Sequence, residues 1–274
     1  MSVDLTSIFA ALKKKEPGDP MPVLFVGHGN PMNAIQNTVF STTWDTLGPR
    51  LPRPEAILCI SAHWLTPGET RVSVTAQPET IHDFSGFPYA LFEQRYPAPG
   101  APDKARQVMD LVNTRRIIAD GEWGLDHGAW SVLGRMFPAA DIPVFQLSLD
   151  YRMAFRDHYQ LARQLKPLRE QGVLIMGSGN LVHNLKAMRS DGPPYDWAVA
   201  FDSKMAEFMD RGKDVAVVNF RDLDDLAKIA HPTWDHFLPL IYTLAQRDEA
   251  DRVHFFNAGF DLASISMRSV ILIP

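Results

Sequence analysis

Short apolar runs alternate along the chain with longer amphipathic stretches. Several of the runs are nearly continuous in Val, Ile, Leu and Phe, which is typical of strands that are covered on both faces. The pattern predicts strands over residues 22–26, 56–61, 71–75, 143–148, 173–176, 214–219, 252–257 and 268–273. It predicts helices over residues 5–15, 34–47, 104–113, 130–137, 155–170, 181–188, 197–211 and 239–247.

This alternation of strands and helices predicts an α/β fold with a mostly parallel central sheet and helices on both of its faces. The chain has 274 residues, which is near the upper limit for one hydrophobic core. Because no internal repeat or long linker interrupts the pattern, we interpret residues 1–274 as a single domain, with a peripheral N-terminal helix within residues 1–20. The stretch 82–100 is rich in Pro, Gly and aromatic residues and is typical of a long functional loop.

Composition and charge exclude several classes of partner. The net charge is −5 and no basic block is present, which argues against nucleic acid binding. The longest apolar runs have the length of strands and fall short of the roughly 20 residues of a membrane span, and the N-terminus lacks a signal-peptide pattern. The single cysteine, Cys59, excludes an internal disulfide and favours a buried thiol in a reducing compartment. We therefore predict a cytoplasmic protein, and a homo-oligomer is compatible with this composition.

The nine histidines of the chain provide its strongest chemical signal. His28, His63 and His183 come where, or shortly after, an apolar run stops. Ligands of open α/β sheets bind beyond the carboxyl ends of the strands, so these three rings are expected to converge at one edge of the sheet. Glycines at 27, 29, 177 and 179 flank or precede two of the histidines and permit sharp turns beside a ligand.

Two further segments add candidates. The segment AHPTWDHFLPL contains His231 and His236, and Pro239 fits the first turn of the helix that follows. His127 lies in GLDHGAW, a polar, glycine-flanked turn. Neutral imidazole binds Zn, Fe, Cu and Ni, and a three-ligand site keeps a position open for substrate or water. The pattern therefore indicates a metal site at the carboxyl ends of the strands.

Each histidine taken alone also has a structural interpretation. A single histidine after a strand is more often a hydrogen-bonded turn residue than a ligand, and His231 can simply stabilise its turn before Pro232. We expect His158 to lie on a solvated helix face and His254 to be a surface or packing residue of a strand. His82 can equally pack within its loop or lie behind the residues that line the pocket.

His183 has an additional feature. Asn180 is a good N-cap for the helix predicted to start at residue 181, which would place His183 in the first turn. The positive end of the helix dipole disfavours imidazolium and is expected to lower the pKa of His183. A neutral histidine near pH 7 is a competent general base or metal contact.

Seven short motifs, in order along the chain, resemble those of the class III extradiol ring-cleavage dioxygenases, and more narrowly the DOPA 4,5-dioxygenase type. They are GHGNP (27–31), SAHW (61–64), IHDFSGFP (81–88), YPAPG (96–100), DHGAW (126–130), GSGNLVHNL (177–185) and PTWDHFLPL (232–240). The resemblance implies a mononuclear non-haem metal held by His28, His63 and His236. It also implies that His183 is the acid/base residue, close enough to coordinate the metal when substrate is absent, and that His127 lines the pocket.

The resemblance implies a single catalytic domain that opens a small aromatic diol with O2. Fe(II) is the metal expected for activity, and a three-histidine set also suits Zn(II). We expect the substrate pocket to involve His231, Trp64, Trp130 and Phe84, although half of the aromatic residues can equally be ordinary core. Arg95 or Arg71 would meet a substrate carboxylate.

Two alternatives remain open at this stage. A zinc-bound water on the same histidines would hydrolyse an ester or amide without O2, and a non-enzymatic metal-binding protein would use the same fold. The chain has GSG but no GxSxG, so a serine-hydrolase elbow is not indicated.

Overall fold

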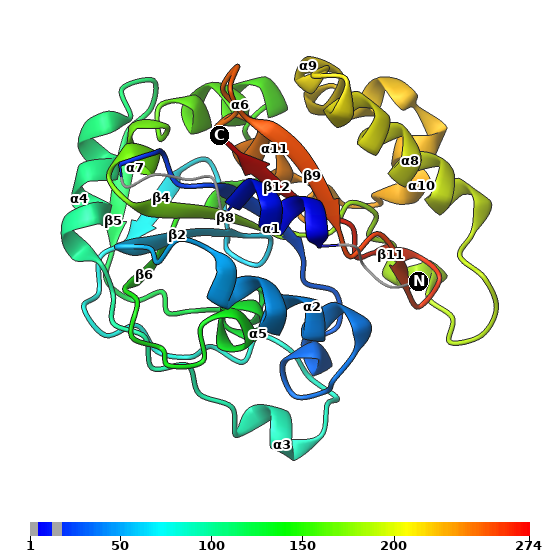
Figure 1. Ribbon diagram of the computed structural model, residues 1–274, viewed down its shortest axis with the longest axis horizontal. Helices are drawn as coiled ribbons and strands as arrows, with labels where there is room; N and C mark the ends of the chain where they lie inside the picture. The colour runs from blue at the N-terminus through cyan, green and yellow to red at the C-terminus, as the bar shows by residue number, and fades with distance from the viewer. Residues whose placement is uncertain (1–4, 13–17) are drawn as a thin grey trace.

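A six-stranded sheet forms the centre of the protein, as the computed structural model of the chain shows for residues 5–12 and 18–274 (Figure 1). Four neighbouring strands are parallel, in the order β6, β2, β8, β1, and β12 and β9 continue the sheet with antiparallel pairings. The prediction of a mostly parallel central sheet is therefore confirmed. The bounds are β1 Val23–Gly27, β2 Ala56–Ser61, β6 Val144–Gln146, β8 Val173–Gly179, β9 Arg252–Phe256 and β12 Ser269–Ile273.

Side chains of the sheet alternate between two hydrophobic cores, one on each face. Val23 and Phe25 of β1 enter one core, whereas Leu24 and Val26 enter the other. Because both faces are covered, the strands consist of apolar residues at successive positions instead of alternating with polar ones. The continuous apolar runs in the sequence have this physical origin.

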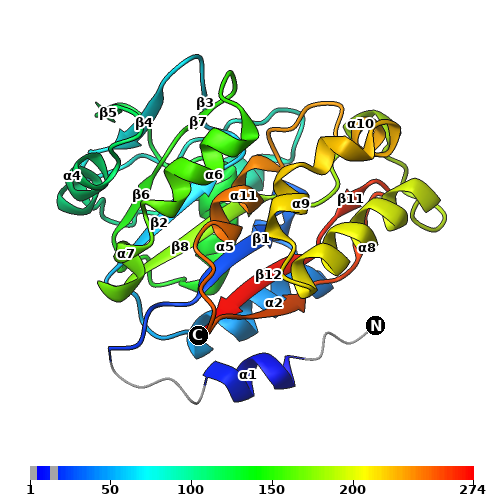
Figure 2. The ribbon, with the colours of Figure 1, turned by 90° about the horizontal axis from the view of Figure 1, so that it is seen from above.

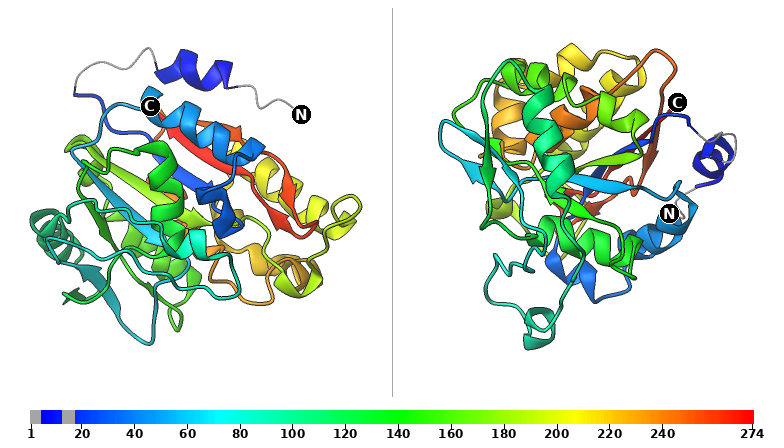
Figure 3. Two further views of the ribbon diagram at one scale, coloured as in Figure 1. Left: turned by 90° about the horizontal axis from the view of Figure 1, so that it is seen from below. Right: turned by 90° about the vertical axis from the view of Figure 1, so that its left-hand side faces the viewer.

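Helices cover both faces, as the views along the sheet show (Figures 2 and 3). One face packs against α1 Thr6–Leu12, α2 Val39–Leu47 and α5 His127–Met136. The other face packs against α6 Phe155–Arg163, α7 Pro167–Glu170, α8 Asp196–Asp210, α9 Asp214–Val218 and α11 Leu238–Leu244. Among the described helices, none combines the length and the apolar character needed to cross a bilayer.

Shorter elements surround this framework. Three two-stranded pairs are β3 Leu65–Thr66 with β7 Leu149–Asp150, β4 Thr70–Ser73 with β5 Ile117–Asp120, and β10 Phe260–Asp261 with β11 Ile265–Ser266. The remaining helical segments are α3 Tyr89–Phe92, α4 Pro102–Leu111 and α10 Asp225–Ala230, with 3-10 turns η1 Pro31–Ala34, η2 Gly48–Arg50, η3 Leu185–Ala187 and η4 Phe220–Leu223.

Two predicted elements were wrong in kind. The apolar run at 214–219 is helix α9, in which Val217 and Val218 are buried and Val215 is 69% exposed. The predicted helix at 181–188 is a turn followed by η3. Its backbone forms hydrogen bonds with distant segments instead of helical ones: the His183 N–H donates to the Ala230 carbonyl, and His183 forms a β-bridge with Ile265.

Several boundaries also differ from the prediction. The helix predicted over 34–47 begins only at Val39, where Thr38 and Ser41 form a reciprocal capping box. The helix predicted over 155–170 is two helices, and the second begins at Pro167. Residues 13–15 of the predicted N-terminal helix lie outside the described residues.

His158 was predicted to be solvated, and this was wrong. Its ring is fully buried between α6 and α11, with Nδ1 3.0 Å from the Tyr242 hydroxyl and Nε2 3.1 Å from the Asp150 carbonyl. Burial lowers the pKa of His158 to about 4, so the ring is neutral at neutral pH.

Candidate active site

Five histidine rings meet at the carboxyl edge of the sheet. His28 directly follows β1, His63 follows β2 by two residues, and His183 follows β8 by four. His236 lies just before α11, and His127 is the first residue of α5. The expectation that distant strand ends would bring these rings together agrees with this arrangement.

The distances define a compact cluster. Nε2 of His28 lies 3.1 Å from Nε2 of His63. The ring centroids of His28, His63 and His236 form a nearly equilateral triangle, with sides of 5.0, 5.1 and 5.1 Å. His127 lies against His63 at 3.9 Å, and His183 stacks on His236 at 3.5 Å with an interplanar angle of 6°.

A polar group behind each of four rings determines which nitrogen faces the centre. His28 Nδ1 lies 2.9 Å from the Ser178 hydroxyl, and His236 Nδ1 lies 2.6 Å from Asp235 Oδ2. Asp83 Oδ2 serves two rings, at 2.9 Å from His127 Nδ1 and 3.3 Å from His63 Nδ1.

Such outer partners hold a histidine in the tautomer whose Nε2 lone pair is free for a metal. The sequence analysis missed Ser178 and Asp83 as site residues. Their only signal was a place inside the motifs GSGNLVHNL and IHDFSGFP.

The donor set fits one metal ion. Two histidine nitrogens that bind the same ion at about 2.0–2.1 Å lie roughly 3.0–3.4 Å apart, depending on the ligand angle. The 3.1 Å between the Nε2 atoms of His28 and His63 falls in that range. By donor-atom spacing alone, His28, His63 and His127 form one group, and His183, Asp235 and His236 form a second group beside it.

Burial keeps three of the five rings neutral, those of His28, His63 and His183. It lowers the pKa values of His28 and His63 well below 6.5, and the neighbouring histidines lower them further. Burial, followed by His236, also lowers the pKa of His183. The lowered pKa agrees with the expectation for His183, but the proposed cause was wrong, because no helix starts at residue 181.

Asp83 carries the negative charge behind the cluster. Burial by itself would raise the pKa of this carboxyl group. The hydrogen bonds from the ring and the backbone of His127, together with electrostatic interactions with His127 and His63, outweigh burial and lower the pKa of Asp83 to about 2. Asp83 is therefore ionised at neutral pH and acts as an acceptor only.

A cavity of about 300 Å³ opens onto the cluster. All five rings face it, and Phe84 and Phe87 from the aromatic loop form part of its wall. This volume lies at the small end of ligand pockets, which suits a single aromatic ring with a short substituent. The other lining residues are Gly29, Asn30, Pro31, Leu185, Met188, Asp261, Leu262 and Ile265.

Three residues expected in the pocket do not line it: Trp64, Trp130 and His231. Trp64 is buried and stacks on Trp123 with a centroid distance of 5.2 Å. The Trp130 indole N–H donates to the Ile81 carbonyl, and its ring lies behind Phe84. Trp130 therefore supports the loop that carries Phe84, whereas Trp64 packs against Trp123.

His231 also lies elsewhere. It sits in an aromatic cluster with Phe201, Phe220 and Phe237, and its Nε2 lies 2.9 Å from the Leu181 carbonyl. Burial lowers its pKa to about 4. The alternative interpretation, in which this histidine stabilises its own turn, agrees better with this position than direct substrate contact does.

The two arginines considered for a substrate carboxylate are outside the cavity lining as well. Arg71 pairs with Glu69 and Asp120. Arg95 donates to the carbonyls of Phe92 and Gln94. Their positive charges are therefore committed to the loops that they connect.

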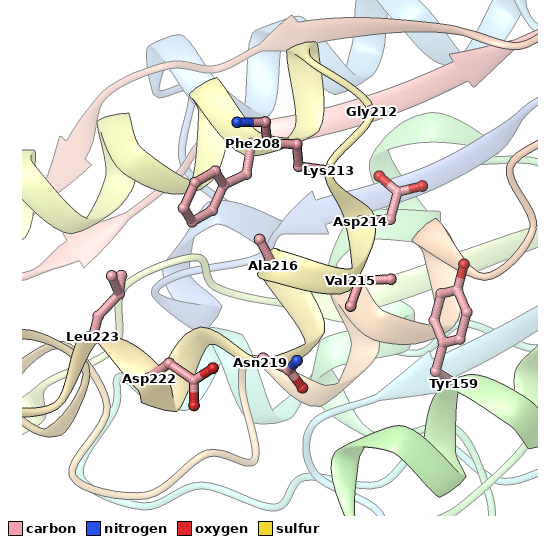
Figure 4. A pocket seen from close by; sticks show the side chains of 10 residues that line it. All are labelled: Tyr159, Phe208, Gly212, Lys213, Asp214, Val215, Ala216, Asn219, Asp222 and Leu223. Atoms are coloured by element: carbon pink, nitrogen blue, oxygen red, sulfur yellow. The ribbon is translucent and has the colours of Figure 1, made fainter.

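A larger, open hollow of about 650 Å³ lies by α8, α9 and η4 (Figure 4). Lys213, Asp214 and Asp222 are its charged residues, and no histidine lines it. Asp214 already pairs with Arg247. The chemistry of the chain is therefore concentrated at the histidine cluster and not at this hollow.

Comparison with known proteins agrees with the motifs. Residues 23–268 match the family described as the catalytic LigB subunit of aromatic ring-opening dioxygenase. A protein of Escherichia coli (strain K12) named 4,5-DOPA dioxygenase extradiol is 41% identical over 256 residues, which cover 91% of this chain and 94% of that protein. A protein of the same name from Beta vulgaris is 37% identical over 247 residues, covering 86% and 91%.

A solved structure extends the comparison to the fold. The crystal structure of uncharacterized protein JW3007 from Escherichia coli K12 matches with a TM-score of 0.79 and 36% identity, covering 92% of this chain and 99% of that one. The matched family and curated relatives confirm the resemblance and give no support to the zinc-hydrolase alternative. The chain belongs to the LigB family of aromatic ring-opening dioxygenases, which makes it an oxidoreductase of the extradiol type.

Proposed function

We propose that this enzyme opens the ring of a DOPA-like catechol beside its two hydroxyl groups, with Fe(II) held by His28, His63 and His236. The observation that carries the ligand set is the triangle of 5.0, 5.1 and 5.1 Å between these three rings. Imidazoles that bind one ion through Nε2 at near-tetrahedral angles have centroids roughly 5 Å apart. The names of the E. coli and Beta vulgaris relatives support DOPA as the type of substrate.

The choice of metal follows from the reaction. A metal ion held by these three histidines would supply the redox chemistry that links the catecholate to O2, which requires an ion such as Fe(II). Three neutral imidazoles also suit Zn(II). Zinc is therefore expected to occupy the same ligands without supporting turnover.

His183 is the residue that we assign to proton transfer. Its ring lines the cavity, stacked on the proposed ligand His236. In the part of the chain that the structure describes, its ring nitrogens have no hydrogen-bond partner, unlike those of the other four rings. A neutral, unengaged imidazole can accept a proton from a substrate hydroxyl and return it to the opened product.

The remaining wall residues bind and orient the ring. His127 is held by Asp83 through Nδ1 and through its backbone N–H, so its Nε2 is directed away from the carboxylate and can accept a hydrogen bond from substrate. Phe84 and Phe87 meet edge to face at 5.3 Å and present apolar surface that excludes water from the aromatic ring.

The decisive test is anaerobic reconstitution with Fe(II), followed by O2 uptake with DOPA, caffeate and protocatechuate. Consumption of one O2 per catechol and a yellow ring-opened product are expected. Turnover of DOPA by the zinc-loaded protein, or no O2 uptake with any catechol after Fe(II) is bound, would refute the proposal.

Variants separate the roles of two stacked rings. His236→Ala is expected to lose both metal and activity, because two ligands remain. His183→Ala is expected to keep most of the metal and lose roughly 10²–10⁴-fold in kcat. His254→Ala, on strand β9 and outside the cavity lining, is the matched control. Normal turnover by His183→Ala would contradict the acid/base assignment.

We also place the protein in the cytoplasm. Cys59 is a free, buried thiol in the middle of β2, and burial raises its pKa well above the usual value. Such a thiol is structural and is compatible with a reducing compartment.

A further inference from the structure

The charge of the active-site cavity is unevenly distributed. Among the described residues that line it, none is a lysine or an arginine, and Asp261 is the one carboxylate. Asp83 and Asp235 are used behind the histidines, where they accept from ring nitrogens. A substrate in the cavity therefore meets a single uncompensated negative group at its wall.

The backbone places Asp261 at a defined distance from the chemistry. Asp261 of β10 pairs with Ile265 of β11, and Ile265 also forms an antiparallel bridge with His183. Residues directly opposite each other in antiparallel strands project to the same face. Asp261, Ile265 and His183 thus line the cavity in one row, with the two outer Cα atoms about 9–11 Å apart, twice the spacing of such a pair.

This separation corresponds to an aromatic ring with a short substituent. A catechol whose hydroxyls lie at the histidine cluster would direct a two- or three-atom arm along Ile265. The wall between is apolar, because Leu185, Met188 and Leu262 join Ile265 there. The end of the arm is then the first part of the substrate that reaches a charged protein group.

The bonding of Asp261 leaves capacity for a cation. Its carboxylate accepts the backbone N–H of Leu262, and no positively charged side chain pairs with it among the described residues. Burial raises the pKa of this carboxyl group, because the charged form has lost part of its hydration. A cationic partner would stabilise the charged carboxylate and so compensate for the hydration that burial removes.

We infer that Asp261 binds the protonated amine of the substrate's side chain and selects catechols with a cationic arm over catechols whose arm ends in a carboxylate. This inference rests on the proposed function, since it assumes that the catechol hydroxyls lie at the histidines. A carboxylate arm would face a like charge across a partly desolvated space, which is unfavourable.

The experiment compares three catechols whose two-carbon arm ends in an ammonium group, a hydrogen atom or a carboxylate: dopamine, 4-ethylcatechol and 3,4-dihydroxyphenylpropionate. The wild-type Fe(II) enzyme is expected to prefer dopamine over the carboxylate by at least about tenfold in kcat/KM. Asp261→Asn is expected to lower kcat/KM for dopamine by roughly 10–100-fold, mainly through KM, as for loss of a hydrogen bond to a charged group. The same variant should leave kcat/KM for 4-ethylcatechol unchanged and raise kcat/KM for 3,4-dihydroxyphenylpropionate.

Asparagine retains the oxygen that accepts the Leu262 N–H, so the turn is expected to persist, and a thermal melt checks this. Asp261→Glu keeps the charge and should recover part of the dopamine preference. Asp210→Asn, an exposed change at the end of α8, is the matched control.

Two failures are distinguishable. If the wild type cleaves 4-ethylcatechol and Asp261→Asn lowers kcat/KM equally for all three substrates, or changes kcat/KM for none of them, the inference is wrong while the proposed function stands. If the wild type consumes no O2 with any of the three, the proposed function itself fails.

Discussion

Asp83→Asn is the substitution that tests the construction of the site most directly. One oxygen of Asp83 accepts from Nδ1 of His127 at 2.9 Å and lies 3.3 Å from Nδ1 of His63, while the other accepts the His127 backbone N–H at 2.9 Å. These contacts require the ring protons to be on Nδ1. The Nε2 atom of His63, which faces His28 at 3.1 Å, therefore keeps its lone pair.

Asparagine preserves the size of the side chain and the contact to the backbone, but it places an NH2 group where Asp83 has its second acceptor. That donor stabilises the opposite tautomer, in which Nε2 carries the proton and is unable to bind metal. Replacement of an outer partner costs roughly 10–100-fold in metal affinity, which corresponds to about 1.4–2.8 kcal/mol. Because His63 is the one proposed ligand among the two rings that Asp83 contacts, we expect a loss within this range.

Competition for Zn(II) or Co(II) against a chromogenic chelator measures this loss without any contribution from turnover. A melting curve of the metal-free protein shows whether the variant is folded. Asp141→Asn, which removes an exposed carboxylate paired with Arg53, serves as the control. Wild-type affinity in a folded Asp83→Asn protein would show that this carboxylate does not set the tautomers.

Three further predictions follow from packing and burial. Gly179→Ala should disrupt the metal site and lower activity, because its Cβ would lie 2.1 Å from the His236 carbonyl oxygen; retained metal affinity would contradict this. Arg169→Met should cost about 3–5 kcal/mol by leaving Asp251 buried and unpaired, seen as a fall in Tm of roughly 6–20 °C. For His158, the unfolded state binds a proton below pH 6.5 while the folded state resists it down to about pH 4. Its contribution, about 3 kcal/mol, is therefore complete above pH 6.5 and lost as the pH falls towards 4; His158→Gln should flatten this part of a urea-denaturation pH profile, and an unchanged profile would refute the assignment.

The central sheet was predictable because its strands are covered on both faces, which forces continuous apolar runs. Short runs outside the sheet were less informative, since four or five apolar residues fit a strand or one turn of helix equally well. The segment at 214–219 became helix α9 because only part of its apolar surface is buried. The segment at 181–188 has no helix because its backbone donors and acceptors are used by Ala230 and Ile265, which the local sequence does not reveal.

Within the site, the rings were predictable and their partners were not. His28, His63 and His183 follow strands, and the ends of parallel strands meet whatever the side chains are. Ser178 contacts His28, which is 150 positions away, and Asp83 contacts His127 and His63, which are 44 and 20 positions away. The local sequence does not reveal such contacts. Trp64, Trp130 and His231 lie one, three and five positions from His63, His127 and His236. Side chains at nearby positions point in different directions, so these three lie behind the wall or in the core.

The difference between His183 and the other four rings explains how similar residues can perform different roles in one cluster. A ring whose Nδ1 is held by Ser178, Asp83 or Asp235 has one tautomer and one direction, as a metal ligand or a substrate contact requires. His183 has a pKa that burial lowers but no such partner, and its position comes from stacking on His236 and from its backbone bridge to Ile265. Stacking restrains the plane of the ring without selecting which nitrogen carries the proton, so this ring alone can lose and regain a proton without breaking a hydrogen bond. In the proposed assignment, the division between ligand and base therefore depends on the groups behind the rings, Ser178, Asp83 and Asp235.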